Sequence, residues 1–200
     1  MVDSEPLWFD VERAFVRERG GDWTAEHARV CTGRGMANTL RVMQEQLRVV
    51  VDVERDEAEI VARFIDRVDE LELKAGFTEL FEAASAHGLP RALASSSPRR
   101  LVEAIARRFG LLARFGAIVS GDGVARPKPA PDIFAEAARL LDVPVRACVV
   151  LEDSLAGMQA GRAAGARVIG VPEAVVPEMH ALADALVKDL HEARALLVFE

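Results

Sequence analysis

The segment 147–171, ACVVLEDSLAGMQAGRAAGARVIGV, constrains the fold of this chain more than any other stretch. Its first five residues are apolar and include two β-branched valines, a pattern typical of a short strand that is buried on both faces. Ser154 can cap a helix that begins near Leu155, and Gly165 can supply the left-handed residue that ends it. Residues 167–171 predict a second strand beside the first. The segment therefore indicates a parallel sheet with a helical crossover.

Two acidic residues, Glu152 and Asp153, follow the first of these strands directly. Ligands of open α/β sheets bind at the carboxyl ends of the strands, so both side chains are expected at that edge. Adjacent carboxylates repel each other unless a cation neutralises them, and hard oxygen ligands suit Mg²⁺. A solvated acidic pair in a loop is the plainer interpretation of the doublet by itself. Because the doublet comes directly after a buried strand, a magnesium site is an equally good interpretation. The other motifs have to decide between the two.

Composition narrows the class of protein. The 200 residues are 50% hydrophobic and 28% charged, which fits a soluble globular protein of one domain, with or without a modest insertion. A formal net charge of −7 argues against nucleic acid as a partner, although an anionic substrate can still meet local arginines. The chain has two cysteines, no basic leader followed by an apolar run, and no apolar run of membrane-spanning length. We therefore expect a reduced, cytoplasmic protein with no membrane partner.

The order of predicted elements divides the chain in two. Helical periodicity dominates the first third, over residues 7–19, 36–50 and 58–71, with a short helical piece after Thr24 and a turn at 32–35. From Gly76 onward the expected helices are 78–87, 98–109, 132–141, one from 155 to Gly165, and 190–197. The expected strands are 91–94, 117–120, 147–151, 167–171 and 185–187. We predict a helical insertion at 7–73 and an α/β core formed by 1–6 and 74–200.

A run of serines follows the strand that ends at Ala94. Ser95, Ser96 and Ser97 come directly after it, and Ser97 can cap a helix whose first residue is Pro98. Hydroxyls and free backbone N–H groups between a strand and a helix N-terminus make an anion site. An ordinary capped turn has the same sequence pattern.

Lys128 lies in the sequence RPKPAPD, where alternating prolines restrict the backbone. A stiff loop can hold its ammonium in place to neutralise a phosphate or a carboxylate, although a rigid surface connector is the other interpretation. Ser95, Lys128 and the Glu152–Asp153 pair all follow predicted strands of one sheet. We therefore expect them to meet at the same edge.

Three motifs together resemble the haloacid dehalogenase-like hydrolases, in particular the branch that holds β-phosphoglucomutase and small sugar-phosphate phosphatases. The motifs are ALASSSP at 92–98, RPKPAPDIF at 126–134 and VVLEDSLAGMQAGRAAGARVIGV at 149–171. The resemblance covers essentially the whole chain. It implies an α/β fold with a Rossmann-like parallel core and a helical cap inserted at about 7–73.

The resemblance also implies roles for individual residues. Ser95 would bind the transferring phosphoryl group, assisted by Ser96 and the backbone N–H groups that follow. Lys128 would neutralise the phosphate and the nucleophile. Asp153 would ligate Mg²⁺, with Glu152 beside it.

The chain departs from this family at its amino end. Relatives carry a strand followed by D-x-D-G, whose first aspartate attacks phosphorus and whose second acts as general acid and base, upstream of a segment like VDSEPLW. Neither Asp3 nor Glu5 takes those places. We therefore expect the first core strand, the nucleophile and a metal ligand to be missing from these 200 residues. The neighbouring strands should then show apolar faces and unpaired backbone groups.

The implied function is a Mg²⁺-dependent phosphatase that acts on a small phosphorylated metabolite, a sugar phosphate, through an aspartyl-phosphate. Gly33 and Arg34 fall in the cap loop that faces the substrate in relatives. Without the nucleophile, a non-catalytic phosphate-binding or regulatory protein on the same scaffold is the alternative. A phosphomutase is less favoured, because such relatives carry a histidine where this chain has Trp8. Phosphonate cleavage needs a cap lysine, which residues 1–73 lack, and the acidic pair disfavours metal-free dehalogenation.

Overall fold

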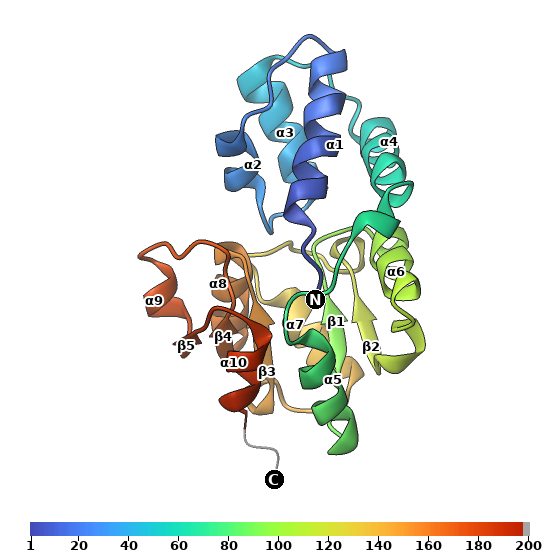
Figure 1. Cartoon of the computed structure of the whole chain (residues 1–200). Coiled ribbons are helices and arrows are strands. Elements are labelled where there is room, and N and C mark those ends of the chain that lie inside the picture. Colours follow the sequence, from blue (N-terminus) through green and yellow to red (C-terminus); the bar gives the residue numbers. More distant parts are fainter. Residues whose placement is uncertain (198–200) are drawn as a thin grey trace.

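The structure is a computed structural model that describes residues 1–197 (Figure 1). A group of helices near the N-terminus stands above a layered α/β part. These helices are α1 (Glu5–Glu18), α2 (Ala25–Cys31), α3 (Met36–Leu47) and α4 (Val53–Ile65). Their helical periodicity buries one face of each: Leu7, Val11 and Phe15 of α1 lie four residues apart and share one apolar core with Leu40 and Phe64. We refer to α1–α4 as the cap.

Side-chain caps decide where two of these helices begin. Thr24 Oγ1 accepts a hydrogen bond from the backbone N–H of His27 at the start of α2. Asp52 Oδ1 accepts one from the N–H of Arg55 at 3.0 Å, so α4 begins at Val53. The prediction that this helix begins at residue 58 was wrong, because the cap at Asp52 allows an additional turn with little apolar periodicity.

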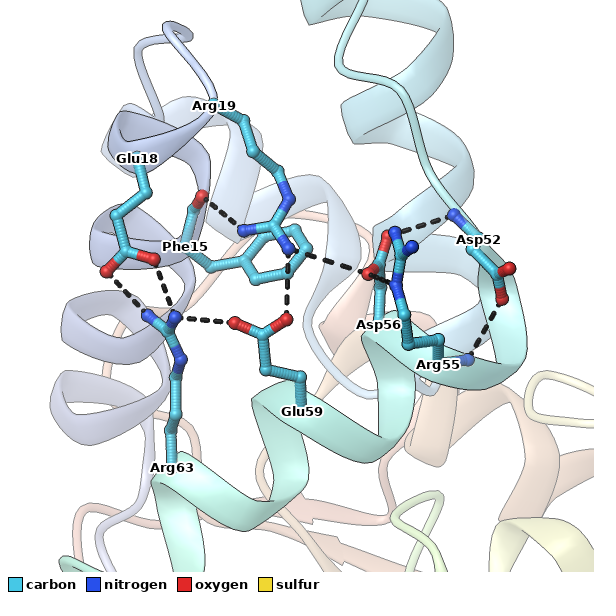
Figure 2. Close-up of polar contacts among 8 residues, drawn as sticks. All are labelled: Phe15, Glu18, Arg19, Asp52, Arg55, Asp56, Glu59 and Arg63. Carbon is cyan, nitrogen blue, oxygen red and sulfur yellow. Dashed lines mark hydrogen bonds and ion pairs between the residues drawn. The ribbon is translucent and has the colours of Figure 1, made fainter.

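Figure 2 shows ion pairs that join α1 to α4. Arg63 donates to Glu18 at 2.6 and 2.8 Å and to Glu59 at 2.5 Å. Arg19 lies 3.0 Å from Glu59 and 3.5 Å from Asp56, whose side chain is fully buried. Burial alone would raise the pKa of Asp56, but hydrogen bonds from its neighbours outweigh burial and lower it. Since a buried charge is costly unless paired, these contacts fix how α1 and α4 pack.

The α/β part alternates strands and helices as predicted. Its strands are β1 (Ala92–Ala94), β2 (Ala117–Val119), β3 (Val149–Glu152), β4 (Arg167–Gly170) and β5 (Ala185–Leu186). Its helices are α5 (Phe77–Ala86), α6 (Arg99–Arg108), α7 (Asp132–Leu140), α8 (Leu155–Ala164), α9 (Met179–Leu182) and α10 (Leu190–Ala195). All paired strands are parallel. Helix α9 was not predicted, because its four residues are too few for a helical period.

Two apolar clusters define the layers of this part. On β4, Val168 packs with residues of α7 and α8, whereas its neighbour Ile169 packs with residues of α5 and α10. Successive side chains of a strand point to opposite faces, so one helix pair covers each face of β4. Within residues 1–197, no helix combines the length and the apolar composition needed to cross a membrane.

The strands form two separate sheets, β1-β2 and β3-β4-β5, with no pairing between β1 and β3. On β3, the carbonyls of Cys148 and Glu152 accept hydrogen bonds from the β4 side, at 3.1 and 2.7 Å. Alternate residues of a parallel strand bond in opposite directions, so the backbone groups of Val149 and Leu151 point away from β4. Both residues are apolar and are nevertheless exposed, each at 39%.

The same alternation applies to β1. The Arg91 carbonyl and the Ser95 N–H bond to the β2 side, at 2.8 and 3.0 Å, so the backbone groups of Ala92 and Ala94 point away from β2. Among residues 1–197, a gap with an unpaired edge on each side thus separates β1 from β3. Unpaired backbone groups and apolar surface were expected at strands of this core, and the absence of a strand that belongs in the gap stays a prediction.

Candidate active site

The carboxyl ends of β1 and β3 open into one cavity of about 870 Å³, which also extends into the gap between these strands and up to the cap. Ser95 follows β1, Glu152 ends β3 with Asp153 after it, and Lys128 comes from the loop before α7. All four residues line this cavity. The structure therefore brings together the residues that the motifs predicted at one edge.

Lys128 and Glu152 form a buried ion pair at the centre of this edge. The Lys128 ammonium bonds to Glu152 Oε1, and the two side chains are only 5% and 9% exposed. The ammonium also lies 4.8 Å from the centroid of the Phe134 ring on α7. Proline restriction of this loop thus places the lysine inside the protein rather than on a surface connector.

The other carboxylate oxygen of Glu152 is bound to the start of α8. Glu152 Oε2 accepts hydrogen bonds from the N–H and the hydroxyl of Ser154, at 3.2 and 3.0 Å. Ser154 in turn caps α8, accepting from the Gly157 N–H at 3.0 Å, as predicted. A side chain at Gly157 would collide with the Glu152 carboxylate, so the glycine makes room for it. Both oxygens of Glu152 are engaged within the protein, which favours Asp153 over Glu152 as a metal ligand.

The serine turn presents polar groups to the cavity. Ser95 Oγ accepts a hydrogen bond from the Ser97 N–H at 3.2 Å, which orients the turn. The prediction that Ser97 caps the next helix was wrong. Helix α6 has Pro98 at its N-cap, and the Arg99 N–H donates to the Asp122 carboxylate at 3.1 Å. The Asp122 carboxylate, which follows β2, thus accepts the hydrogen bond at the start of α6 that the Ser97 hydroxyl was expected to accept.

The cap loop contacts the core directly at Gly33. Ser96 Oγ donates to the Gly33 carbonyl at 2.9 Å. Gly33 has φ +77°, and a side chain there would collide with the Ser154 hydroxyl. Gly33 lines the cavity, whereas Arg34 is exposed and does not line it. The substrate contact predicted for Arg34 stays a prediction.

Sequence reasoning missed Lys74, which lies 3.5 Å from Asp153 and 3.3 Å from Glu173. Burial would lower the pKa of Lys74, but the two carboxylates outweigh burial and raise it. The sequence did offer one signal for Lys74, because lysine is rare in this chain. Two of its three lysines, Lys74 and Lys128, line this cavity.

Asp153 is the carboxylate best placed to hold a metal ion. Its side chain is 45% exposed and is paired at 3.5 Å with Lys74. No group of three or more His, Cys, Asp or Glu side chains suited to a metal occurs in the part of the chain that the structure describes. Mg²⁺ commonly takes only one or two carboxylates and completes its shell with water and substrate phosphate. The donors present fit that mode of binding and not an all-protein metal cage.

A parallel α/β core, a helical cap over its carboxyl edge, and a serine, a lysine and a carboxylate in one cavity define a capped α/β protein with a polar site between cap and core. The sequence model of the haloacid dehalogenase-like hydrolases matches residues 2–165, and the chain belongs to that family. The resemblance drawn from the three motifs is thus confirmed.

Relatives cover the chain almost completely. Hexitol phosphatase B of Escherichia coli K12 is 31% identical over 98% of this chain and 90% of its own length. The bifunctional riboflavin kinase/FMN phosphatase of Arabidopsis thaliana is 30% identical over 97% of the chain, which spans only 52% of the plant protein. A solved structure of CbbY from Rhodobacter sphaeroides in complex with phosphate has a TM-score of 0.87 at 30% identity, over 98% of this chain and 95% of that one. A second CbbY structure, with xylulose-1,5-bisphosphate, has a TM-score of 0.86 at 30% identity over 96% and 91% of the two chains.

Proposed function

We propose that this chain forms most of a Mg²⁺-dependent phosphatase that hydrolyses a small phosphorylated metabolite, a sugar phosphate. The observation that carries the proposal is the convergence of Ser95, Lys128 and Asp153 on one cavity beneath the cap. Donors fixed in advance around a phosphoryl group stabilise the charge that develops on it during transfer. The names of the relatives support the substrate class, because hexitol phosphatase B acts on a phosphorylated sugar alcohol by its name and CbbY binds phosphate in its crystal.

Each residue has a role in this proposal. Ser95 donates its hydroxyl proton to a phosphate oxygen, and the N–H groups of the serine turn add further donors. Lys128, held by Glu152, directs its remaining N–H bonds toward the same oxygens. Asp153 would hold Mg²⁺, which would supply positive charge to neutralise the phosphate.

The gap between β1 and β3 is the proposed place of the nucleophile. A parallel strand in the gap would pair with the free backbone groups of residues 92, 94, 149 and 151 and would cover the exposed Val149 and Leu151 side chains.

The carboxyl end of such a strand would lie between Ser95 and Asp153, since these residues follow the two flanking strands. Met1 lines the cavity at the same edge. We therefore propose that polypeptide preceding Met1 supplies the strand and carries the nucleophilic carboxylate. One carboxylate oxygen would bond to phosphorus as the ester oxygen leaves with a proton. Water would then cleave the acyl phosphate and return the carboxylate with free phosphate.

A phosphate-binding protein without catalysis is the second candidate. Within residues 1–197 no strand fills the gap, and this candidate needs no nucleophile there. This candidate keeps the roles of Ser95 and Lys128 in binding phosphate and removes only the covalent step.

Phosphate affinity tests what both candidates share. In calorimetry with inorganic phosphate and Mg²⁺, Ser95→Ala and Lys128→Gln should each weaken binding by ~10-fold or more, since each removes a donor to the phosphate. Ser85→Ala is the matched control, because the Ser85 hydroxyl bonds to the Phe81 carbonyl within α5. Equal phosphate affinity in all variants would contradict the proposed site. A turnover screen over sugar phosphates and nucleotides then separates the phosphatase from the binding protein.

A further inference from the structure

The cap surface that faces the cavity is acidic and aromatic. Helix α1 contributes Glu5, Trp8, Phe9 and Glu12 to the cavity lining. The lysines and arginines that line the cavity, within residues 1–197, come from outside α1–α4. Cationic side chains therefore line the core side of the cavity, where the phosphoryl group is proposed to bind. The cap helices α1–α4 contribute no lysine or arginine to the described lining of the space left for the remainder of the substrate.

Glu5 lies close to the phosphoryl site. The Thr32 hydroxyl donates to Glu5 Oε2 at 2.9 Å, which leaves its other oxygen for a ligand. Burial raises the pKa of Glu5; the hydrogen bond from Thr32 opposes this, and the Asp153 carboxylate adds to it. Glu5 and Asp153 line the same cavity, so Glu5 borders the space between cap and core.

Glu12 lies deeper in the cap and is only 6% exposed. Trp23 Nε1 donates to Glu12 Oε2 at 3.0 Å. Burial raises the pKa of Glu12 to about 8, so this carboxyl is mostly protonated at neutral pH. A protonated carboxyl both donates and accepts hydrogen bonds, which suits a ligand hydroxyl.

The aromatic residues add apolar surface beside these carboxyl groups. Trp8 is held in place by Phe64, with ring centroids 4.4 Å apart. Trp8 and Phe9 both line the cavity. Carboxyl groups next to aromatic rings match a molecule with hydroxyls on a hydrocarbon skeleton.

We propose that the part of the substrate beneath the cap is a neutral, polyhydroxylated sugar or polyol, so that the protein selects monophosphates and discriminates against bisphosphates. This inference rests on the proposed phosphate site. Lys74 acts electrostatically on Glu5, but it is already paired with Asp153 and Glu173. Among the described lining residues, a second phosphate would therefore meet the Glu5 carboxyl group with no cation from α1–α4, and like charges repel. A solved CbbY structure contains a bisphosphate, xylulose-1,5-bisphosphate, whereas the lining of this cavity favours a singly phosphorylated ligand.

Fructose 6-phosphate and fructose 1,6-bisphosphate form a matched pair of probes, because they differ only in the second phosphate. With Mg²⁺, calorimetry on the 200-residue chain should show the monophosphate binding at least ~10-fold more tightly than the bisphosphate. Glu5→Lys should reverse or remove that preference by supplying a cation. Glu26→Lys, at an exposed position on α2, should keep it.

The outcomes separate the two proposals. Binding of inorganic phosphate with equal or tighter binding of the bisphosphate would overturn this inference and leave the phosphate site standing. Bisphosphate binding that depends on Arg34, shown by its loss in Arg34→Gln, would overturn it in the same way. Failure of all three ligands to bind would overturn the phosphate site and this inference with it.

Discussion

The Lys128 ammonium bonds to Glu152 Oε1 inside the protein, where the two side chains are 5% and 9% exposed. Lys128→Met would leave the Glu152 carboxylate buried without its cation. Breaking a buried ion pair in this way costs ~3 to 5 kcal/mol, so the free energy of unfolding in urea should fall by about that amount. Lys188→Met is the control, since the Lys188 side chain is 76% exposed. Equal losses in the two variants would show that the pair does not matter for stability.

Magnesium affinity should depend on Asp153. Asp153→Asn removes the charge of a carboxylate whose ion pair with Lys74 is long, at 3.5 Å. Calorimetry should show Mg²⁺ binding weakened ~10-fold or more. Asp142→Asn is the matched control, because Asp142 lies after α7 with φ 55°, a conformation that asparagine also tolerates. Identical Mg²⁺ affinities would rule out Asp153 as the ligand.

The strands, the helices and most of the site were predictable because they follow local patterns. Ser95 and Glu152 each come after a short apolar run, and parallel strands bring such positions to one edge, although β1 and β3 belong to separate sheets. Lys74 could not be found in this way, because its partners Asp153 and Glu173 come from distant segments. The wrong assignment of the cap at Ser97 has the same cause, since Asp122 reaches the start of α6 from across β2.

Stability should fall with rising pH because of Glu12. The folded-state pKa of about 8 lies above the ordinary value of 4.5, so the folded state holds a proton that the unfolded chain has lost between these values. The free energy of unfolding should therefore decrease through this window by at most about 1.4 kcal/mol per pH unit from this group. Glu12→Gln keeps an acceptor for Trp23 and should flatten the slope, whereas Glu54→Gln, at an exposed position, should not. Urea unfolding at pH 5 to 8 measures it, and an unchanged slope in Glu12→Gln would contradict the assignment.

Contact between cap loop and core should depend on Gly33. Gly33→Ala places a side chain against the Ser154 hydroxyl, whereas Gly20→Ala, at the same φ of +77°, meets nothing within 4 Å. Both variants carry the left-handed penalty of ~1 to 2 kcal/mol, and only the first adds a collision. Gly33→Ala should lose about 1 kcal/mol more stability and should show faster amide exchange at the loop residues 32–36. Matching behaviour of the two variants would mean that the loop is not held against the core.

Completion of the sheet should raise stability. Extending the chain before Met1 by an apolar strand of ~5 residues and an Asp-x-Asp-Gly turn would pair the free edges of β1 and β3 and cover Val149 and Leu151. Thermal unfolding should then occur at a higher temperature than in the 200-residue chain. The control extension has the same length and a glycine and serine composition, and it should give no such gain.

Hydrolysis of p-nitrophenyl phosphate by these chains in the presence of Mg²⁺ tests the proposed phosphatase and its missing nucleophile most directly. The extended chain should turn over the substrate, the 200-residue chain should not, and replacing the first aspartate of the added turn by asparagine should abolish turnover. Robust turnover by the 200-residue chain, or a stabilised extended chain that remains inert, would contradict the account.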